Sequence, residues 1–117
     1  MSVIDLESGE RVEISGKNSG SGAELGKYGK FVGLEYDSQE QKIIVADYLT
    51  NHVLTVDEIT GERLIISDND ASKGPKINQI GRIVFDSINN RLFVVDTGLK
   101  AIFVINIDDG SRAIVSR

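Results

Sequence analysis

Short apolar runs alternate with polar turn formers along almost the whole chain. Four runs rich in Val, Ile, Leu, Phe and Tyr lie between residues 31 and 68, and four more lie between residues 80 and 117. A few polar residues with Gly or Asn between β-rich runs indicate hairpins, and no segment keeps a helical period. The predicted strands are Phe31–Tyr36, Lys42–Ala46, His52–Asp57, Arg63–Ser67, Ile80–Phe85, Arg91–Val95, Ala101–Asn106 and Arg112–Ser116.

The two groups of predicted strands are copies of each other. Phe31–Asp68 aligns with Ile80–Arg117 without a gap, at a constant offset of 49 residues (80 minus 31). A partial third copy opens the chain, because Gly9-Glu10-Arg11 matches Gly61-Glu62-Arg63. A period of this size indicates stacked supersecondary units. The strands that the partial copy adds are Ser2–Leu6 and Arg11–Ser15.

Four antiparallel strands per copy, joined as a meander, are typical of a β-propeller blade. We therefore predict a single all-β domain of β-propeller-like, four-stranded antiparallel blades in an incomplete propeller. Residues 1–15 form a half blade, residues 31–68 a blade and residues 80–117 a second blade. The alternative is a ten-stranded β-sandwich, and the equal repeats favour blades. The Gly-rich segment Gly16–Gly29 and the segment Asn69–Gln79 are predicted to be solvated connections between blades.

Composition narrows the classes of function. The chain has 117 residues, a formal net charge of −5 and a pI near 4.8, so it lacks the basic surface that nucleic acid or an anionic membrane would attract. The absence of cysteine excludes disulfides, thiolate zinc sites and cysteine nucleophiles. The N-terminus shows no signal-peptide pattern, which predicts a cytoplasmic protein, or a periplasmic or secreted one if the chain is an excised fragment.

Several segments resemble NHL-type propeller blades. They are Gly33-Leu34-Glu35-Tyr36-Asp37, Ile44-Val45-Ala46-Asp47 and Arg91-Leu92-Phe93-Val94-Val95-Asp96. The ending Gly110–Ser116 is similar to repeats of the gluconolactonase and strictosidine-synthase-like propellers. The resemblance covers nearly the whole chain and implies blade architecture, but complete rings have about four to eight blades and this chain carries two and a half. It also implies an expectation of a divalent cation, because gluconolactonase-like propellers bind one in the central channel.

Four aspartates are candidates for a metal site. Asp47 and Asp96 occupy the same repeat position, and this recurrence favours a role in turn hydrogen bonding over ligation. Asp68 and Asp70 belong to a stretch with oxygen side chains at alternate positions, as in calcium loops. There, however, Gly74 comes one place late and Gln79 stands where a bidentate Glu is expected, so a solvated turn is favoured. We predict no metal or cofactor, with calcium as the alternative.

Two residues are candidates for binding. His52 is the only histidine, and its repeat equivalent is Ala101, so the fold does not require it. Tyr48 replaces Thr97 at a strand-end turn and is predicted to be exposed. No catalytic set accompanies either residue, and the catalytic residues stay unassigned.

The function predicted best is a propeller-type binding or interaction module, acting as an oligomer or inside a longer propeller. The alternatives are a metal-dependent, lactonase-like hydrolase assembled from several chains, and a truncated structural fragment. An incomplete ring leaves sheet edges and apolar faces uncovered, which predicts self-association as a dimer or larger assembly. The sequence names no other protein partner or small-molecule ligand, and it predicts no nucleic acid or membrane partner.

Overall fold

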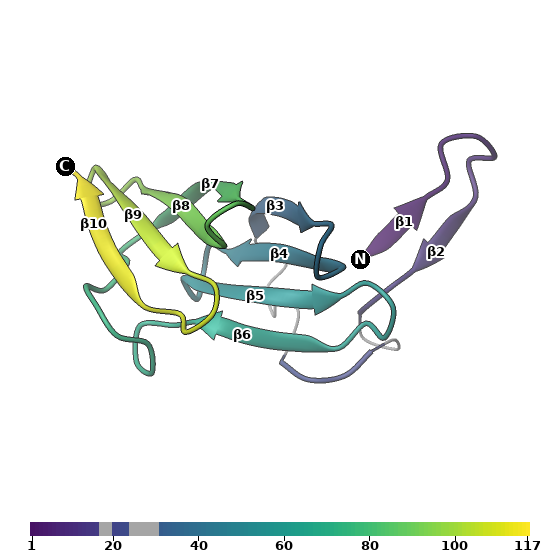
Figure 1. Ribbon diagram of the computed structural model, residues 1–117, viewed down its shortest axis with the longest axis horizontal. Coiled ribbons are helices and arrows are strands. Elements are labelled where there is room, and N and C mark those ends of the chain that lie inside the picture. The colour runs from purple at the N-terminus through teal and green to yellow at the C-terminus, as the bar shows by residue number, and fades with distance from the viewer. Residues whose placement is uncertain (17–19, 24–30) are drawn as a thin grey trace.

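The computed structural model describes residues 1–16, 20–23 and 31–117, and in these ranges the chain is all-β without a helix (Figure 1). The strands are β1 (Ser2–Ile4), β2 (Arg11–Glu13), β3 (Phe31–Asp37), β4 (Lys42–Asp47), β5 (His52–Asp57), β6 (Arg63–Ser67), β7 (Ile80–Asp86), β8 (Arg91–Asp96), β9 (Ala101–Asn106) and β10 (Arg112–Ser116). All ten begin at the predicted residue, whereas β1 and β2 end two residues earlier than predicted.

Eight of the strands form two four-stranded antiparallel meanders. The first sheet has the order β3-β4-β5-β6, and the second has the order β10-β9-β8-β7. Their registers correspond, since Leu34 lies opposite Val45 in the first sheet and Ile83 lies opposite Val94 in the second. The prediction of an all-β fold with repeated four-stranded antiparallel sheets is therefore confirmed. Strands β1 and β2 form a separate two-stranded hairpin that extends away from the first sheet (Figure 1).

Asp and Gly residues shape the strand-end turns. Asp5, Asp57 and Asn106 each accept a hydrogen bond at a side-chain oxygen from a backbone amide two positions further on, at 2.8 Å in all three turns. Gly61 and Gly110 both have a φ of 74°, which glycine adopts without steric cost.

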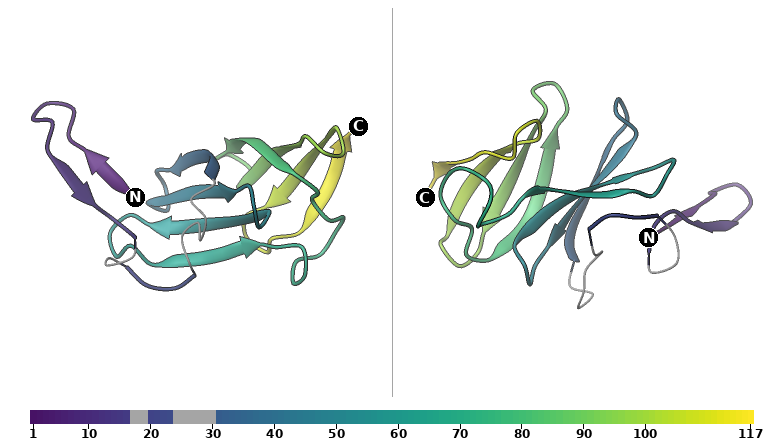
Figure 2. Two further views of the ribbon diagram at one scale, coloured as in Figure 1. Left: turned by 180° about the vertical axis from the view of Figure 1, so that it is seen from behind. Right: turned by 90° about the horizontal axis from the view of Figure 1, so that it is seen from below.

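The main core lies between the two sheets, which pack against each other through β3 and β7 (Figure 2). A Cβ atom at Gly33 would stand 2.7 Å from Cγ1 of Ile83, so a side chain there would push the sheets apart. Glycine at this position therefore permits the close approach. The buried apolar residues of this core are Ile44, Ala46, Val53, Ile77, Ile80, Ile83, Leu92, Val94, Ala101, Phe103 and Ile105.

A second, smaller cluster lies on the opposite side of the first sheet. Its buried members are Ile43, Val45, Leu54 and Val56. Met1, Ile14 and Ala23 pack against it, together with Ile65 of β6. The predicted connection Gly16–Gly29 falls partly outside the described residues, and its described part runs beside β6, where Gly22 pairs with Arg63.

Candidate functional site

Asp47 and Asp96 use their carboxylates to hold backbone. Oδ1 of Asp47 accepts hydrogen bonds from the amides two and three positions further on, at 2.9 and 3.3 Å. Asp96 is fully buried and accepts from the amides of Asn78 (2.7 Å), Gln79 (3.2 Å) and Leu99 (2.9 Å). Asp96 thus ties its own turn to the connection between the sheets. These bonds fit the structural role that the recurrence favours.

Asp68 and Asn69 are engaged in the same way. Oδ1 of Asp68 accepts from the amides of Asp70 (2.8 Å) and Ala71 (2.6 Å), and the bond from Ala71 is the main cause that lowers the pKa of this carboxyl. The Asn69 side chain bonds both the amide and the carbonyl of Ile77, at 2.9 and 2.8 Å. Asp70 is exposed. In ranges 1–16, 20–23 and 31–117, no three His, Asp or Glu residues are grouped so that they could hold a metal ion.

Tyr48 and His52 lie at the two ends of the β4–β5 turn. The Tyr48 hydroxyl accepts a hydrogen bond from Nε2 of Gln79, in the connection to the second sheet. His52 is half-buried and pairs with Asp47 in the strand register, and its amide donates to Oγ1 of Thr50 at 3.3 Å. The Tyr48 side chain therefore bonds the connection to the second sheet, whereas the His52 ring makes no hydrogen bond to any described residue.

Asn51, in the same turn, was not identified from the sequence. Its Oδ1 accepts from the amide of Ile80 at 2.9 Å, and its Nδ2 donates to the carbonyl of Asn78 at 3.0 Å. Its equivalent in the second repeat is Lys100, so the repeat pattern gives no signal for this bond.

A buried arginine clasps the connection between the two sheets. Arg112, at the start of β10, donates from Nη1 to Ser67 Oγ (3.2 Å) and to the Asp68 carbonyl (2.7 Å), and from Nε to the Pro75 carbonyl (2.8 Å). Its own amide donates to the Lys73 carbonyl at 2.8 Å. Burial lowers the pKa of Arg112, and a guanidinium remains charged in a protein even so. We call this arrangement an arginine clamp: an arginine at the start of an outer strand bonds the connection that precedes its own sheet.

Arg63 forms the same clamp one repeat earlier. Its Nη1 donates to Ser15 Oγ (2.6 Å) and the Gly16 carbonyl (3.2 Å), its Nε to the Ala23 carbonyl, and its amide to the Ser21 carbonyl (2.6 Å). Each of these four partners corresponds to a partner of Arg112 at an offset of 52 residues (67 minus 15). The two clamps therefore fix each connection against the outer strand of the sheet that follows it.

The two sheets differ in what covers the side that faces the N-terminus. Leu34 on the first sheet is 61% exposed, whereas its equivalent Ile83 on the second sheet is 8% exposed because the first sheet covers it. We call three exposed residues of β3, Phe31, Leu34 and Tyr36, the N-terminal face. A cavity beside this face is lined by Phe31, Gly33 and Leu34 of β3, together with Met1, Ser2 and Val45.

The side of the second sheet that faces away from the first sheet is also uncovered. Val95 and Ile102 are 42% and 40% exposed, whereas their equivalents Ala46 and Val53 are fully buried between the sheets. Val84 belongs to the same side through its pairing opposite Phe93. We call Val84, Val95 and Ile102 the outer face.

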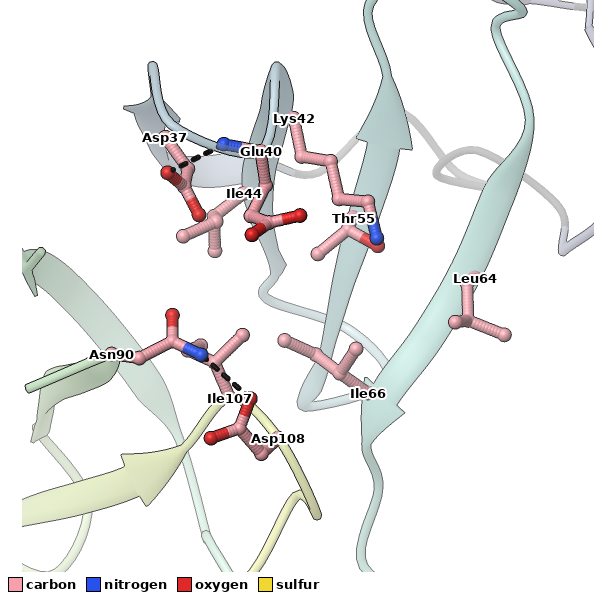
Figure 3. A pocket seen from close by; sticks show the side chains of 10 residues that line it. All are labelled: Asp37, Glu40, Lys42, Ile44, Thr55, Leu64, Ile66, Asn90, Ile107 and Asp108. Atoms are coloured by element: carbon pink, nitrogen blue, oxygen red, sulfur yellow. Dashed lines mark hydrogen bonds between the residues drawn. The ribbon is translucent and has the colours of Figure 1, made fainter.

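A second cavity, of about 330 Å³, lies between the first sheet and the turns of the second (Figure 3). Asn90 bonds Asp108 there at 2.8 Å, and Asp37 accepts from turn amides. His52, the only histidine of the chain, is not among the lining residues. The cavity thus offers carboxylates, the Lys42 amine and the Thr55 hydroxyl above an apolar floor. The lining side chains drawn in Figure 3 include Asp37, Glu40, Lys42, Ile44, Ile66, Ile107 and Asp108.

Comparisons with known proteins leave the site to be interpreted from its geometry. No protein-family model matches the chain, and no curated protein sequence matches it. In the part of the chain that the structure describes, no helix has the length and apolar character needed to cross a bilayer.

Proposed function

We propose that this chain is a β-propeller-type interaction module, built from NHL-like blades, that works by associating with further copies of itself or as part of a longer propeller. The observation that carries the proposal is the exposure of apolar residues at positions whose repeat equivalents are buried. Leu34, Val95 and Ile102 are exposed, whereas Ile83, Ala46 and Val53 are buried in the contact between the sheets. The interface already present inside the chain therefore supplies the pattern for a second one.

The occupant that fits the outer face best is the N-terminal end of a second copy. Within the chain, the equivalent of the outer face is covered by the next repeat in the N-to-C direction. Among the described residues, no preceding repeat covers the β1–β2 hairpin or the N-terminal face. Association of the outer face of one copy with the N-terminal end of another would extend the same stacking order. Uncovered apolar sheet faces are surfaces that soluble proteins usually bury.

The test is the oligomeric state in solution. Sedimentation velocity at micromolar concentration should show the purified chain as a dimer or larger species, and Ile102→Lys should shift it to the monomer, because the ammonium would be buried against apolar surface. Ile88→Lys is the matched control, since Ile88 is an almost fully exposed residue of the β7–β8 turn. A folded wild-type chain that stays monomeric across the concentration range would overturn the proposal.

A further inference from the structure

Three Gly-x-Arg turns occur in the chain, and within the described residues only two of them hold a clamp. The turns are Gly9-Glu10-Arg11, Gly61-Glu62-Arg63 and Gly110-Ser111-Arg112. Their backbones agree: the glycine φ values are 73°, 74° and 74°, and each glycine amide donates to a strand-end carbonyl at 2.7 to 2.8 Å. The first turn thus has the conformation of the two that hold a connection.

In the two occupied turns, the end of the preceding outer strand lies against the glycine. A Cβ at Gly61 would stand 2.2 Å from the Ile14 carbonyl oxygen, and one at Gly110 would stand 1.9 Å from that of Ile66. At Gly9, no described atom lies within 4 Å of the same point. The Arg11 side chain is exposed and, among the described residues, makes no hydrogen bond or ion pair.

The last strand carries the complementary feature. Ser67 ends the preceding outer strand in one clamp, and Ser15 follows the preceding outer strand by two residues in the other. They are 1% and 0% exposed, and Ser15 Oγ also donates to the Gly61 carbonyl at 2.6 Å. Their equivalent is Ser116, at the end of β10. Val115 and Ser116 are exposed, and Ser116 has no side-chain hydrogen bond to any described residue.

We infer that the Gly9–Arg11 turn is a receptor for the Val115–Ser116 end of β10 in a second copy. The Val115 carbonyl would lie against Gly9, the Ser116 hydroxyl would donate to the Gly9 carbonyl, and the Arg11 guanidinium would donate to Ser116 Oγ and to the carbonyl that follows it. The inference rests on the proposed self-association and adds its polarity: one copy joins the next head to tail. A head-to-tail interface gives a closed ring or an open chain of copies rather than an isologous dimer.

Charge-assisted hydrogen bonds from a guanidinium are among the stronger polar contacts of an interface. Arg11→Ala should therefore raise the dissociation constant of the assembly about tenfold or more, as should Ser116→Leu, which removes the hydroxyl and adds bulk. Lys76→Ala is the control, because it removes one exposed positive charge from the connection between the sheets. Circular dichroism melts show whether each variant keeps its fold.

Mixing the variants tests the polarity. Arg11→Ala retains an intact Ser116, and Ser116→Leu retains an intact Arg11, so an equimolar mixture can form one complete junction per pair of chains. At a concentration between the wild-type and variant dissociation constants, sedimentation should show each variant alone as a monomer and the mixture as a species of two copies. Loss of association in Ile102→Lys with no effect of Arg11→Ala beyond that of Lys76→Ala would overturn this inference and leave the proposed function standing. A monomeric wild-type chain would overturn both.

Discussion

The first and second sheets share a backbone plan, yet equivalent positions on them meet different surroundings. Tyr36 on the first sheet is exposed, and its hydroxyl donates to Glu58 Oε2 at 2.6 Å, a bond that raises the pKa of the tyrosine. Phe85, its equivalent on the second sheet, packs against the buried core between the sheets. The difference teaches that the neighbour, rather than the strand itself, decides which apolar positions are buried.

Truncating one side chain at the same repeat position in each sheet should give the largest contrast. Ile83→Ala should lower the free energy of unfolding by about 2–4 kcal/mol, because it leaves a cavity in the core between the sheets. Leu34→Ala should lower it by less than about 1 kcal/mol, because the side chain is mostly in water. Urea denaturation of the two variants measures both values, and equal losses would show that the N-terminal face is buried in solution.

The clamp of the second sheet offers the next contrast. Arg112→Ala should cost about 2–3 kcal/mol, because it removes the guanidinium that donates to the buried Ser67 hydroxyl and to the Pro75 and Asp68 carbonyls. Arg82→Ala, at an exposed residue of β7, should change stability by no more than about 0.5 kcal/mol. Thermal denaturation compares them. A loss as small in Arg112→Ala as in Arg82→Ala would mean that water replaces the clamp without cost.

The repeated aspartates sharpen the comparison further. Asp96→Ala should cost about 2 kcal/mol and Asp47→Ala about 1 kcal/mol, since only Asp96 also holds the connection to the other sheet. The free energies of unfolding in urea give the order. If Asp47→Ala left stability unchanged but abolished binding of added Ca²⁺ in a calorimetric titration, a ligand role would replace the structural one.

The smallest expected effect is a difference in acid sensitivity. The amides of Thr60 and Ile59 lower the pKa of Asp57 from its usual 3.8, and the equivalent residue of the second sheet, Asn106, does not titrate. A carboxyl whose folded pKa is lowered stabilises the fold above its unfolded pKa, and this contribution is lost as the pH falls through the folded pKa. Asp57→Asn should therefore lose less stability than the wild type between about pH 5 and pH 2. Denaturation midpoints across this range would refute the idea if both proteins fell in parallel.

The sequence allowed the strands and many turns to be predicted, because both depend on local pattern. The Asp47 carboxylate, for example, accepts turn hydrogen bonds, as its repeat position predicts. The sequence contains a further recurrence that marks the clamps: Ser15 precedes Gly22 by seven residues, as Ser67 precedes Gly74. That recurrence indicates that the two connections have a common structural requirement. It does not indicate that an arginine much later in the sequence bonds each connection.

Other features could not be predicted because they depend on what lies beside each sheet. Leu34 and Ile83 have equivalent strand patterns, so nothing local distinguishes the exposed residue from the buried one. Asn51 holds the connection to the second sheet, but its repeat equivalent is a lysine. Contacts made once, between segments that the repeat does not relate, need the three-dimensional arrangement to be seen.

The meander order of the strands also bears on how the chain folds. Every strand of the two sheets pairs with a neighbour in sequence, so each sheet can form by closing short loops of low entropic cost. Pairing between sequence neighbours keeps the separation of contacting residues within each sheet short, which favours formation of each sheet before the two sheets dock. We expect the slower step to be the docking of β7 on β3, where Ile83 must enter the space beside Gly33. A chain built this way would gain its strand pairing early and its full burial late.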